Sequence, residues 1–140
     1  MQTFLPYPEF DRSAAVLDMR RLGKQRVECS QILNALTGVS AGWKNHPATL
    51  MWRGHERALC LYSIDVCVAW RARGYKDSLL SAFRYLLPTF KDTGVPKWLG
   101  NEEFHRSHQS NLIRKLPEHY GPLFPGVPAD LPYVWPKTDA

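Results

Sequence analysis

The sequence predicts a mainly α fold, a compact single-domain helical bundle with an extended C-terminal tail rich in proline and aromatic residues. Apolar residues recur at helical spacing in several long segments, polar N-cap residues and glycine stops bracket those segments, and strand-like alternation is scarce. We expect one domain over residues 1–140, with the helical core over 1–116 and a wrapping tail over 117–140.

A first long helix is predicted from its N-cap Asp18 to about Leu36, with Gly38 just beyond its end. Gly23 weakens this helix by about 1 kcal/mol relative to alanine, but it allows another chain segment or a ligand to approach the backbone closely. The residues expected to pack inward share one side of the helix: Leu22, Cys29, Leu33 and Leu36.

Two further helices are predicted on either side of Gly54. Pro47 suits the first position of a short helix capped by His46, and a longer helix runs from His55 to Arg73 and stops at Gly74. The middle of the longer helix is apolar nearly all round, so we expect it to be the central buried element.

The C-terminal half is predicted to hold two more helices and the tail. One helix begins at Asp77 or Ser78 and ends before Pro88, and the other is capped by Asn101 and covers residues 102–115. Six prolines alternate with aromatic residues in the last 24 positions, so we expect an extended segment whose rings pack on the core.

The composition places the chain in the cytoplasm. No apolar stretch is long enough to cross a bilayer, and the N-terminus lacks the basic start and apolar core of a secretory signal. The three cysteines, Cys29, Cys60 and Cys67, form no C-x-x-C pair, and their odd number suits no closed disulfide framework. We expect them to be free and buried.

The basic residues favour a polyanionic partner. The net charge is +5 and the isoelectric point is near 9.3. The positive residues cluster in the first long helix and again in and around the central helix: Arg20, Arg21, Lys24 and Arg26, then Arg53, Arg57, Arg71, Arg73 and Lys76. Such clusters on a compact domain are the electrostatic footprint of phosphate binding.

Four polar residues of the first helix share one stripe beside its apolar side. Arg21, Lys24, Gln25 and Glu28 follow i, i+3, i+4, i+7 spacing. Residues in this position are anchored by the core on one side and line a cleft on the other. The alternative is a solvated surface on which Lys24 and Glu28 form an ordinary i, i+4 ion pair.

Histidines and loop aromatics supply further candidates. His105 and His108 are spaced i, i+3 on one predicted helix, but no spacing in the sequence matches a zinc site, so we expect no metal. These two histidines are then structural or contact substrate. Trp43 and Tyr120 lie in predicted loops beside glycines and are candidates for stacking on bases, with a structural role as the alternative.

Several short motifs occur in a set order along the chain. They are Met-x-x-Phe-x-x-x-Pro-x-Phe at the start, Leu17-Asp18 before a basic helix with an internal glutamate, Asn45-His46-Pro47, Arg73-Gly74-Tyr75, and the run from Ser107 to Tyr120. In this order the chain resembles the pyrimidine-dimer DNA glycosylases, the phage endonuclease V type and their short bacterial relatives, from residue 1 to about residue 120. The segment from Phe104 to Ser110 looks like the signature of a distinct branch.

The resemblance implies a chemistry that begins at the N-terminus. In this family an N-terminal α-amine attacks the sugar C1′ of a damaged nucleotide, a Schiff base forms, the base is lost and β-elimination cuts the strand. A helix glutamate assists the proton transfers and stabilises the positive sugar. These roles fall on Met1 and Glu28. An ordinary α-amine, with a pKa near 8, is partly neutral at pH 7 and therefore nucleophilic. No cofactor is implied.

The chain departs from the family pattern in two places. The phage enzyme removes its methionine to expose threonine, whereas Met1 before the large Gln2 is expected to be retained; the bacterial members start one residue shorter, so the Met1 amine corresponds to the same place. The family also has arginine just before its glutamate and another a turn later, where this chain has Val27 and Gln31. We therefore expect different phosphate contacts.

The leading hypothesis is a DNA glycosylase with abasic-site lyase activity, acting on double-stranded DNA that carries a damaged or modified base and associated with the nucleoid when bound. The expected site comprises Met1 and Glu28 as catalysts, Lys24 as reserve nucleophile, Arg21, Lys24, Gln25, Arg26, Lys44, His46 and Tyr120 on DNA, and Gln2, Trp43, His105 and His108 as candidate substrate contacts. One alternative is a DNA-binding module on the same fold without turnover. Another is a small-molecule or metal-dependent hydrolase centred on the two histidines.

Overall fold

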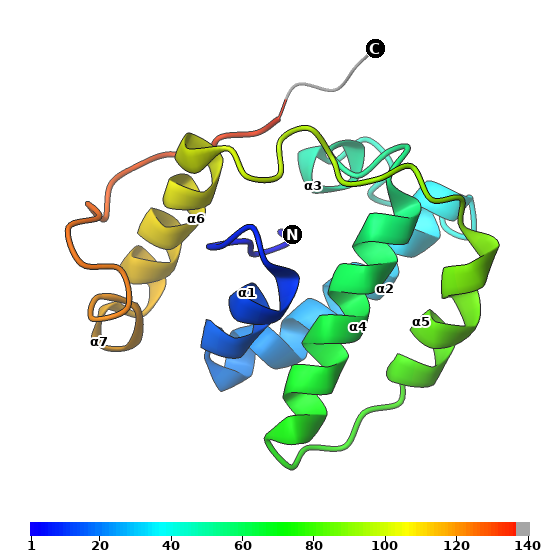
Figure 1. Ribbon diagram of the computed structural model, residues 1–140, viewed down its shortest axis with the longest axis horizontal. Helices are drawn as coiled ribbons and strands as arrows, with labels where there is room; N and C mark the ends of the chain where they lie inside the picture. The colour runs from blue at the N-terminus through cyan, green and yellow to red at the C-terminus, as the bar shows by residue number, and fades with distance from the viewer. Residues whose placement is uncertain (137–140) are drawn as a thin grey trace.

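The computed structural model, which describes residues 1–136, is built from helices and contains no strand within those residues (Figure 1). This confirms the mainly α class. In chain order the elements are α1 (Phe10–Val16), α2 (Met19–Thr37), α3 (Pro47–Leu50), α4 (Glu56–Ala72), α5 (Leu80–Leu86), the 3-10 helix η1 (Leu87–Thr89), α6 (Glu102–Lys115) and α7 (Pro117–Tyr120).

Helix α4 is the central element, as its composition predicts, because it packs against α1, α2 and α5. At its crossing with α2 the indole of Trp70 lies on the backbone of Gly23, where a β-carbon would come within 2.9 Å of the ring. The predicted close approach at this glycine is therefore made by another segment of the chain. The free cysteines of α2 and α4 are buried, as expected.

The helix boundaries follow the predicted caps. The Asp18 side chain accepts a hydrogen bond from the Arg21 amide, and Gly38 ends α2 in the left-handed region with φ of 82°. Asn101 caps α6 by accepting from the Phe104 amide. Asp77 accepts from the amides of residues 79 and 80, so α5 begins three residues later than the earliest predicted start.

Two short helices were not predicted. Helix α1 escapes sequence rules because Glu9, at its N-cap, makes no side-chain cap hydrogen bond. Helix α7 corrects the prediction of a wholly extended tail: Pro117 occupies its first turn, a position where a missing amide hydrogen costs nothing. From residue 121 to residue 136 the tail has no helix or strand, and residues 137–140 lie outside the described part of the chain.

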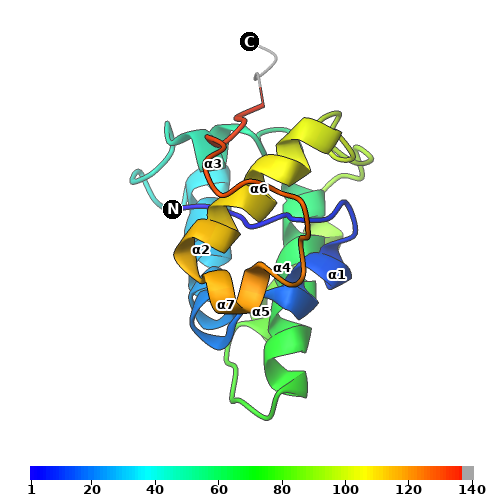
Figure 2. The same cartoon turned by 90° about the vertical axis from the view of Figure 1, so that its left-hand side faces the viewer.

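Residues 1–8, called the N-terminal segment below, run through the interior of the molecule. Figures 1 and 2 show this segment passing between α6 on one side and α1 and α4 on the other. Residues 2–6 are all buried. A non-helical segment in the interior must have partners for its backbone polar groups, and those partners come from side chains.

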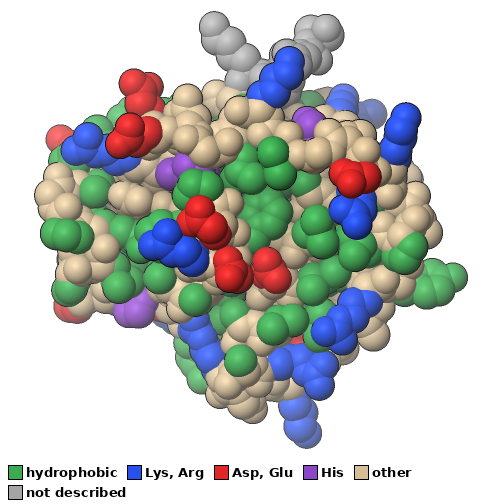
Figure 3. All heavy atoms as spheres, in the orientation of Figure 1, with side chains coloured by type: hydrophobic (Ala, Val, Ile, Leu, Met, Phe, Trp, Pro, Cys, Tyr) green, Lys and Arg blue, Asp and Glu red, His purple; other side chains and the backbone are tan. Residues whose placement is uncertain are grey.

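No helix within residues 1–136 has the length and apolarity needed to cross a membrane. The face of the molecule that carries α1 and α4 has acidic side chains gathered near its middle, with basic side chains toward its margins (Figure 3). Burial and the nearby Asp11 raise the pKa of Asp65 on α4. This face is therefore less suited to a phosphate backbone than an evenly basic surface would be.

Candidate active site at the N-terminus

Side chains of α2 hold the first residues of the N-terminal segment. The amide of Gln2 donates to Glu28 Oε2 at 2.9 Å. Gln25 makes two bonds to the same segment: its Nε2 donates to the Gln2 carbonyl at 2.7 Å, and its Oε1 accepts from the Phe4 amide at 2.7 Å. One turn of α2 thus forms hydrogen bonds with successive backbone groups of the segment, as a neighbouring β-strand would.

Helices α4 and α6 hold the segment from the other sides. The Tyr62 hydroxyl donates to the Phe4 carbonyl at 2.6 Å. The Leu5 amide donates to His108 Nδ1 at 3.0 Å, and His105 Nδ1 bonds the Leu5 carbonyl at 2.7 Å. Because His105 Nε2 accepts from a backbone amide, its proton is on Nδ1, which is the donor. The position of the N-terminus is therefore fixed by three helices.

Glu28 is the acid of this site. Its carboxylate is largely buried, with one oxygen on the Gln2 amide and the other 3.9 Å from the ammonium of Lys24. The α-nitrogen of Met1 is joined to that same Gln2 amide nitrogen through only the α-carbon and carbonyl carbon of Met1. Met1 is half-buried, so the terminus is fixed on one side and open to solvent on the other.

His46 belongs to the same electrostatic cluster. Its Nδ1 accepts from the Ala48 amide at 3.0 Å and caps α3, which leaves Nε2 as the protonated nitrogen of the neutral ring. Burial lowers the pKa of His46, the positive N-terminal amine lowers it further, and the carboxylate of Glu28 opposes both effects. The Met1 amine and Glu28 are thus close enough to His46 to affect its pKa.

Two tryptophans flank the His46 ring. Trp43 lies at a ring-centroid distance of 5.6 Å and Trp135 at 6.2 Å, both nearly perpendicular to the imidazole. Trp43 is 52% exposed and has a φ of 67°, a conformation that a bulky residue rarely adopts. Exposed aromatic rings such as that of Trp43 form a surface on which a nucleobase can stack.

Three predicted DNA contacts are corrected, because their side chains are engaged within the protein. Gln25 is 1% exposed and its amide is used by the N-terminal segment. Arg26 pairs with the buried carboxylate of Asp77 and lies over the Trp70 ring. Tyr120 is fully buried, and its hydroxyl bonds Asp18. Gln25 and Tyr120 are buried and the Arg26 side chain is only 14% exposed, so these residues serve the fold and offer little or no surface to DNA.

The two predicted substrate-contacting histidines of α6 are also structural. Both are buried, and each bonds the backbone of Leu5. Burial lowers the pKa of His108 to about 3, and the neighbouring His105 contributes to the same direction, so the ring stays neutral. Within residues 1–136 no group of three histidine, cysteine or acidic side chains is arranged to hold a metal ion. This arrangement gives no support to a hydrolase centred on these histidines.

The remaining predicted cations differ in how exposed their side chains are. Lys24 is beside Glu28, with its side chain 78% exposed. Arg21, one turn earlier, is partly buried and paired with Asp18 at 3.1 Å. Lys44 is exposed in the loop before α3. The structure therefore leaves Lys24 and Lys44 as the predicted cations most open to a phosphate.

The sequence analysis did not identify the residues that are far from the N-terminal segment in sequence but contact it in the fold. Tyr62 lies in the apolar middle of the predicted central helix, but a buried tyrosine needs a partner for its hydroxyl, and this need is a signal that it contacts a polar group. Trp52 donates from its indole to Thr3 at 3.0 Å. Tyr133 and Trp135 lie in the tail, and no local pattern predicts which surface a tail will reach.

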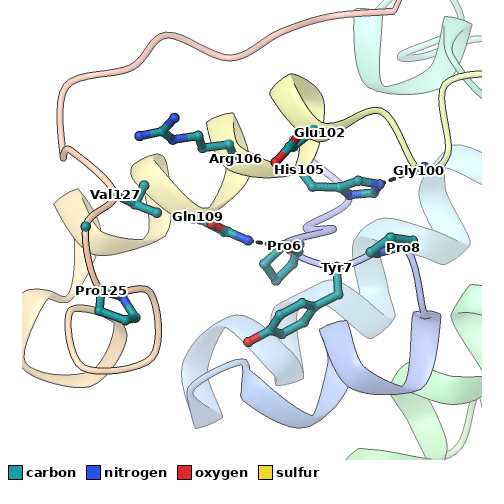
Figure 4. Close-up of a pocket in the computed structure, with 11 residues that line it drawn as sticks. Pro6, Tyr7, Pro8, Gly100, Glu102, His105, Arg106, Gln109, Pro125 and Val127 are labelled. Carbon is teal, nitrogen blue, oxygen red and sulfur yellow. Dashed lines mark hydrogen bonds between the residues drawn. The ribbon is translucent and has the colours of Figure 1, made fainter.

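A cavity of about 540 Å³ lies elsewhere along the N-terminal segment, toward α6 and the tail. Figure 4 shows Tyr7, Arg106 and Gln109 around it, with Gln109 bonded to the Pro6 carbonyl. The residues around Glu28 and His46 do not line this cavity. This cavity is therefore separate from the candidate site at the terminus.

Comparison with known families gives a match for residues 1–81, to the family described as pyrimidine dimer DNA glycosylase. The match covers more than half of the 140 residues and includes Glu28 and His46, while α6 and the tail lie beyond it. No curated protein matches the chain, and no solved structure does.

Proposed function

Because the chain belongs to the pyrimidine dimer DNA glycosylase family, a family of DNA glycosylases acting on DNA, we propose that it excises a damaged or modified base through its N-terminal amine. In this proposal Met1 supplies the nucleophile and Glu28 the acid–base group. Abasic-site lyase activity follows from the same covalent intermediate.

The observation that carries the proposal is the bond from the Gln2 amide to Glu28 Oε2 at 2.9 Å. It ties the carboxylate to the backbone atom next to the α-amine, across 26 residues of sequence. The bond satisfies a buried backbone amide, and it also holds an ionisable carboxylate beside the terminal amine. A carboxylate in that place is suited to exchange a proton with the amine.

The proposed reaction balances as follows. The neutral amine of Met1 attacks C1′, the glycosidic bond breaks, and the base leaves with the electron pair and takes up a proton. The amine loses a proton to Glu28, and Glu28 gives this proton to the ring oxygen O4′ as the C1′–O4′ bond breaks, which leaves a protonated Schiff base and a hydroxyl group on the opened sugar. Loss of a proton from C2′ then expels the 3′ phosphate, and water releases the protein. The carboxylate also stabilises the positive charge on the sugar.

Lys24 is the less suitable nucleophile. Its side chain is 78% exposed and its ammonium is paired with Glu28, so nothing at this position desolvates the charged group. An amine that acts as a nucleophile requires a neutral form, which burial or a neighbouring cation would favour. We assign Lys24 to the phosphate backbone, together with Arg21, Lys44 and His46.

Borohydride trapping on duplex DNA with a single abasic site tests the proposal. We expect a covalent adduct whose tryptic peptide, identified by mass spectrometry, contains residue 1. The Lys24→Ala variant should still be trapped, whereas a protein with an acetylated N-terminus should not. Glu28→Gln should lower the rate of trapping or strand cleavage by at least about 100-fold, the scale of a general acid–base group.

Two results would overturn the proposal. The first is an adduct on Lys24, which would move the nucleophile to α2. The second is a wild-type protein that binds the abasic duplex but forms no adduct with it, which would make the chain a DNA-binding module without turnover.

A further inference from the structure

We propose that Arg20, Arg73 and Lys76 form a second basic patch, which binds the phosphate backbone of the undamaged DNA on one side of the attacked nucleotide. The inference rests on the proposed function, since it takes the terminus beside Glu28 to be the place where the sugar is attacked. The three cations lie outside the terminal site, which gives them no role.

The turn after α4, residues 73–77, packs against the start of α2. The Tyr75 ring stacks on Trp70 at a centroid distance of 4.3 Å, and the Tyr75 hydroxyl donates to Met19 Sδ at 2.9 Å. Because Arg20 follows Met19 on α2, the turn and Arg20 lie at the same end of the molecule.

The two cations of the turn are held through their own hydrogen bonds. Arg73 Nη2 donates to the Ala15 carbonyl, in the last turn of α1, at 3.1 Å. Trp70 Nε1 donates to the Lys76 carbonyl at 2.9 Å. Both residues are exposed, as is Arg20. Figure 3 shows basic side chains gathered at the lower end of the molecule, where Figure 1 places the end of α4.

The two acids nearest to the patch in sequence, Asp18 and Asp77, are already paired. Asp18 lies 3.1 Å from the guanidinium of Arg21, and the fully buried side chain of Asp77 lies 2.8 Å from that of Arg26. Within residues 1–136 no ion pair involves a residue of the second basic patch. Its charges are therefore available to a polyanion.

The second basic patch continues the polar stripe of α2 away from the terminus. Arg20, Lys24 and Glu28 follow one another at intervals of four residues and share one side of the helix. At a rise of about 1.5 Å per residue, Arg20 lies about 12 Å along the helix from Glu28. One strand of a duplex carries a phosphate about every 3.4 Å along its axis, so this distance spans about three or four nucleotides.

The other half of α2 offers no such cations. Residues 29–37, from Glu28 to the end of the helix, contain no lysine or arginine. The patch therefore makes the protein asymmetric about the attacked sugar: it binds the phosphates of one flank and leaves the other without an equivalent contact. This asymmetry is the property that an experiment can measure.

Binding to duplexes with unequal flanks tests the proposal. Each duplex carries a single tetrahydrofuran abasic analogue. The long duplex has about ten base pairs, roughly one helical turn, on both sides of it. Two short duplexes each have one flank cut to about two base pairs, about 7 Å, which is too short to reach the patch. Fluorescence anisotropy gives the dissociation constant of the full-length protein over a range of salt concentrations.

The double variant Arg20→Gln/Lys76→Gln removes two charges and leaves Arg73 bonded to α1. On the long duplex its slope of log affinity against log salt should be smaller than that of the wild type by about two. When salt rises about fourfold, the affinity of the wild type should then fall about tenfold more than that of the variant. Each single variant should show about half of the change in slope.

The short duplexes show where the contact lies. With one of them the wild type and the double variant should have equal slopes, because the phosphates that the patch binds are missing. With the other they should differ as they do on the long duplex. The control Arg84→Gln removes an exposed charge from α5 and should keep the wild-type slope on all three duplexes.

Equal slopes for the wild type and the double variant on the long duplex would overturn the inference. A reduction of the same size on all three duplexes would also overturn it, because that is the effect of net charge and not of a contact with one flank.

Borohydride trapping on the same preparations distinguishes this inference from the proposed function. Trapping by the wild type, with slopes that do not depend on the patch, refutes the second basic patch alone. Slopes that depend on the patch and on one flank, without any trapping, refute the amine chemistry and leave the patch in place.

Discussion

Removal of the Gln25 side chain should destabilise the protein more than removal of a solvent-exposed polar side chain on a helix would. Gln25→Ala leaves the Gln2 carbonyl and the Phe4 amide without partners in a buried place, while Tyr62 keeps its bond to the Phe4 carbonyl. Each buried backbone group left unpaired costs about 1–3 kcal/mol, so the free energy of unfolding should fall by about 2–6 kcal/mol.

Urea denaturation followed by circular dichroism measures this loss directly. A change of about 4 kcal/mol is large against the total stability of a small domain, and it should lower the midpoint by about 2 M urea. Gln31→Ala is the matched control, because Gln31 lies on the same helix and is exposed. It should change the free energy of unfolding by less than about 0.5 kcal/mol.

A loss of less than about 1 kcal/mol in Gln25→Ala, similar to that of Gln31→Ala, would refute the reasoning, because it would mean that the N-terminal segment does not depend on these bonds. If Gln25→Ala does not fold, Tyr62→Phe serves instead. It removes only the hydroxyl that bonds the Phe4 carbonyl and Gln25, and should cost about 1–3 kcal/mol.

Three further perturbations test other parts of the structure. Since burial holds the pKa of His108 at about 3 in the folded protein while the unfolded ring titrates near 6.5, its contribution to stability is complete above pH 6.5 and declines below it, by up to about 1.4 kcal/mol per pH unit. His108→Asn, which can still accept from Leu5, should flatten the dependence of urea-unfolding free energy on pH between 6.5 and 4; an unaltered slope would contradict this. Lys44→Ala should reduce the slope of log affinity for DNA against log salt by about one, measured by fluorescence anisotropy, and an unchanged slope would remove Lys44 from the phosphate contacts. Gly23→Ala should show no gain in melting temperature, although the exchange ordinarily stabilises a helix by about 1 kcal/mol, because the new methyl group meets the Trp70 ring; a clear gain would show that this ring moves freely.

The helices could be predicted because their ends are marked locally. Asp18, His46 and Asn101 each satisfy free amides of the turn that follows them, and such caps act within three residues. Helix α1 carries no such mark at Glu9, and its existence depends on packing against α4. Local rules therefore predict the capped helices and miss the one that tertiary contacts maintain.

The residues of the candidate site also fall into those that local patterns predict and those that only tertiary contacts place. Glu28 and His46 were predicted from spacing and family resemblance; Glu28 accepts from the Gln2 amide, and the N-terminal amine lowers the pKa of His46. Gln25, on the same stripe as Glu28, was predicted to contact DNA but faces the buried backbone instead. Helical spacing shows that two residues share a stripe, yet it does not show whether another segment covers that stripe. Trp135 was missed for the same reason, since its place depends on contacts with α6.

The bonds from α6 to the N-terminal segment also determine when the site can form. Leu5 bonds His108 across 103 residues of sequence, and Pro6 bonds Gln109 across the same separation. During synthesis the N-terminus is the first part of the chain to leave the ribosome, but these partners do not exist until most of the chain has been made. The backbone of residues 2–6 is thus accessible to enzymes that act on nascent chains throughout that interval, and it becomes buried only when α6 docks. Under the proposed mechanism, trimming or acylation of the first residue in that interval decides whether a free terminal amine is present in the folded site.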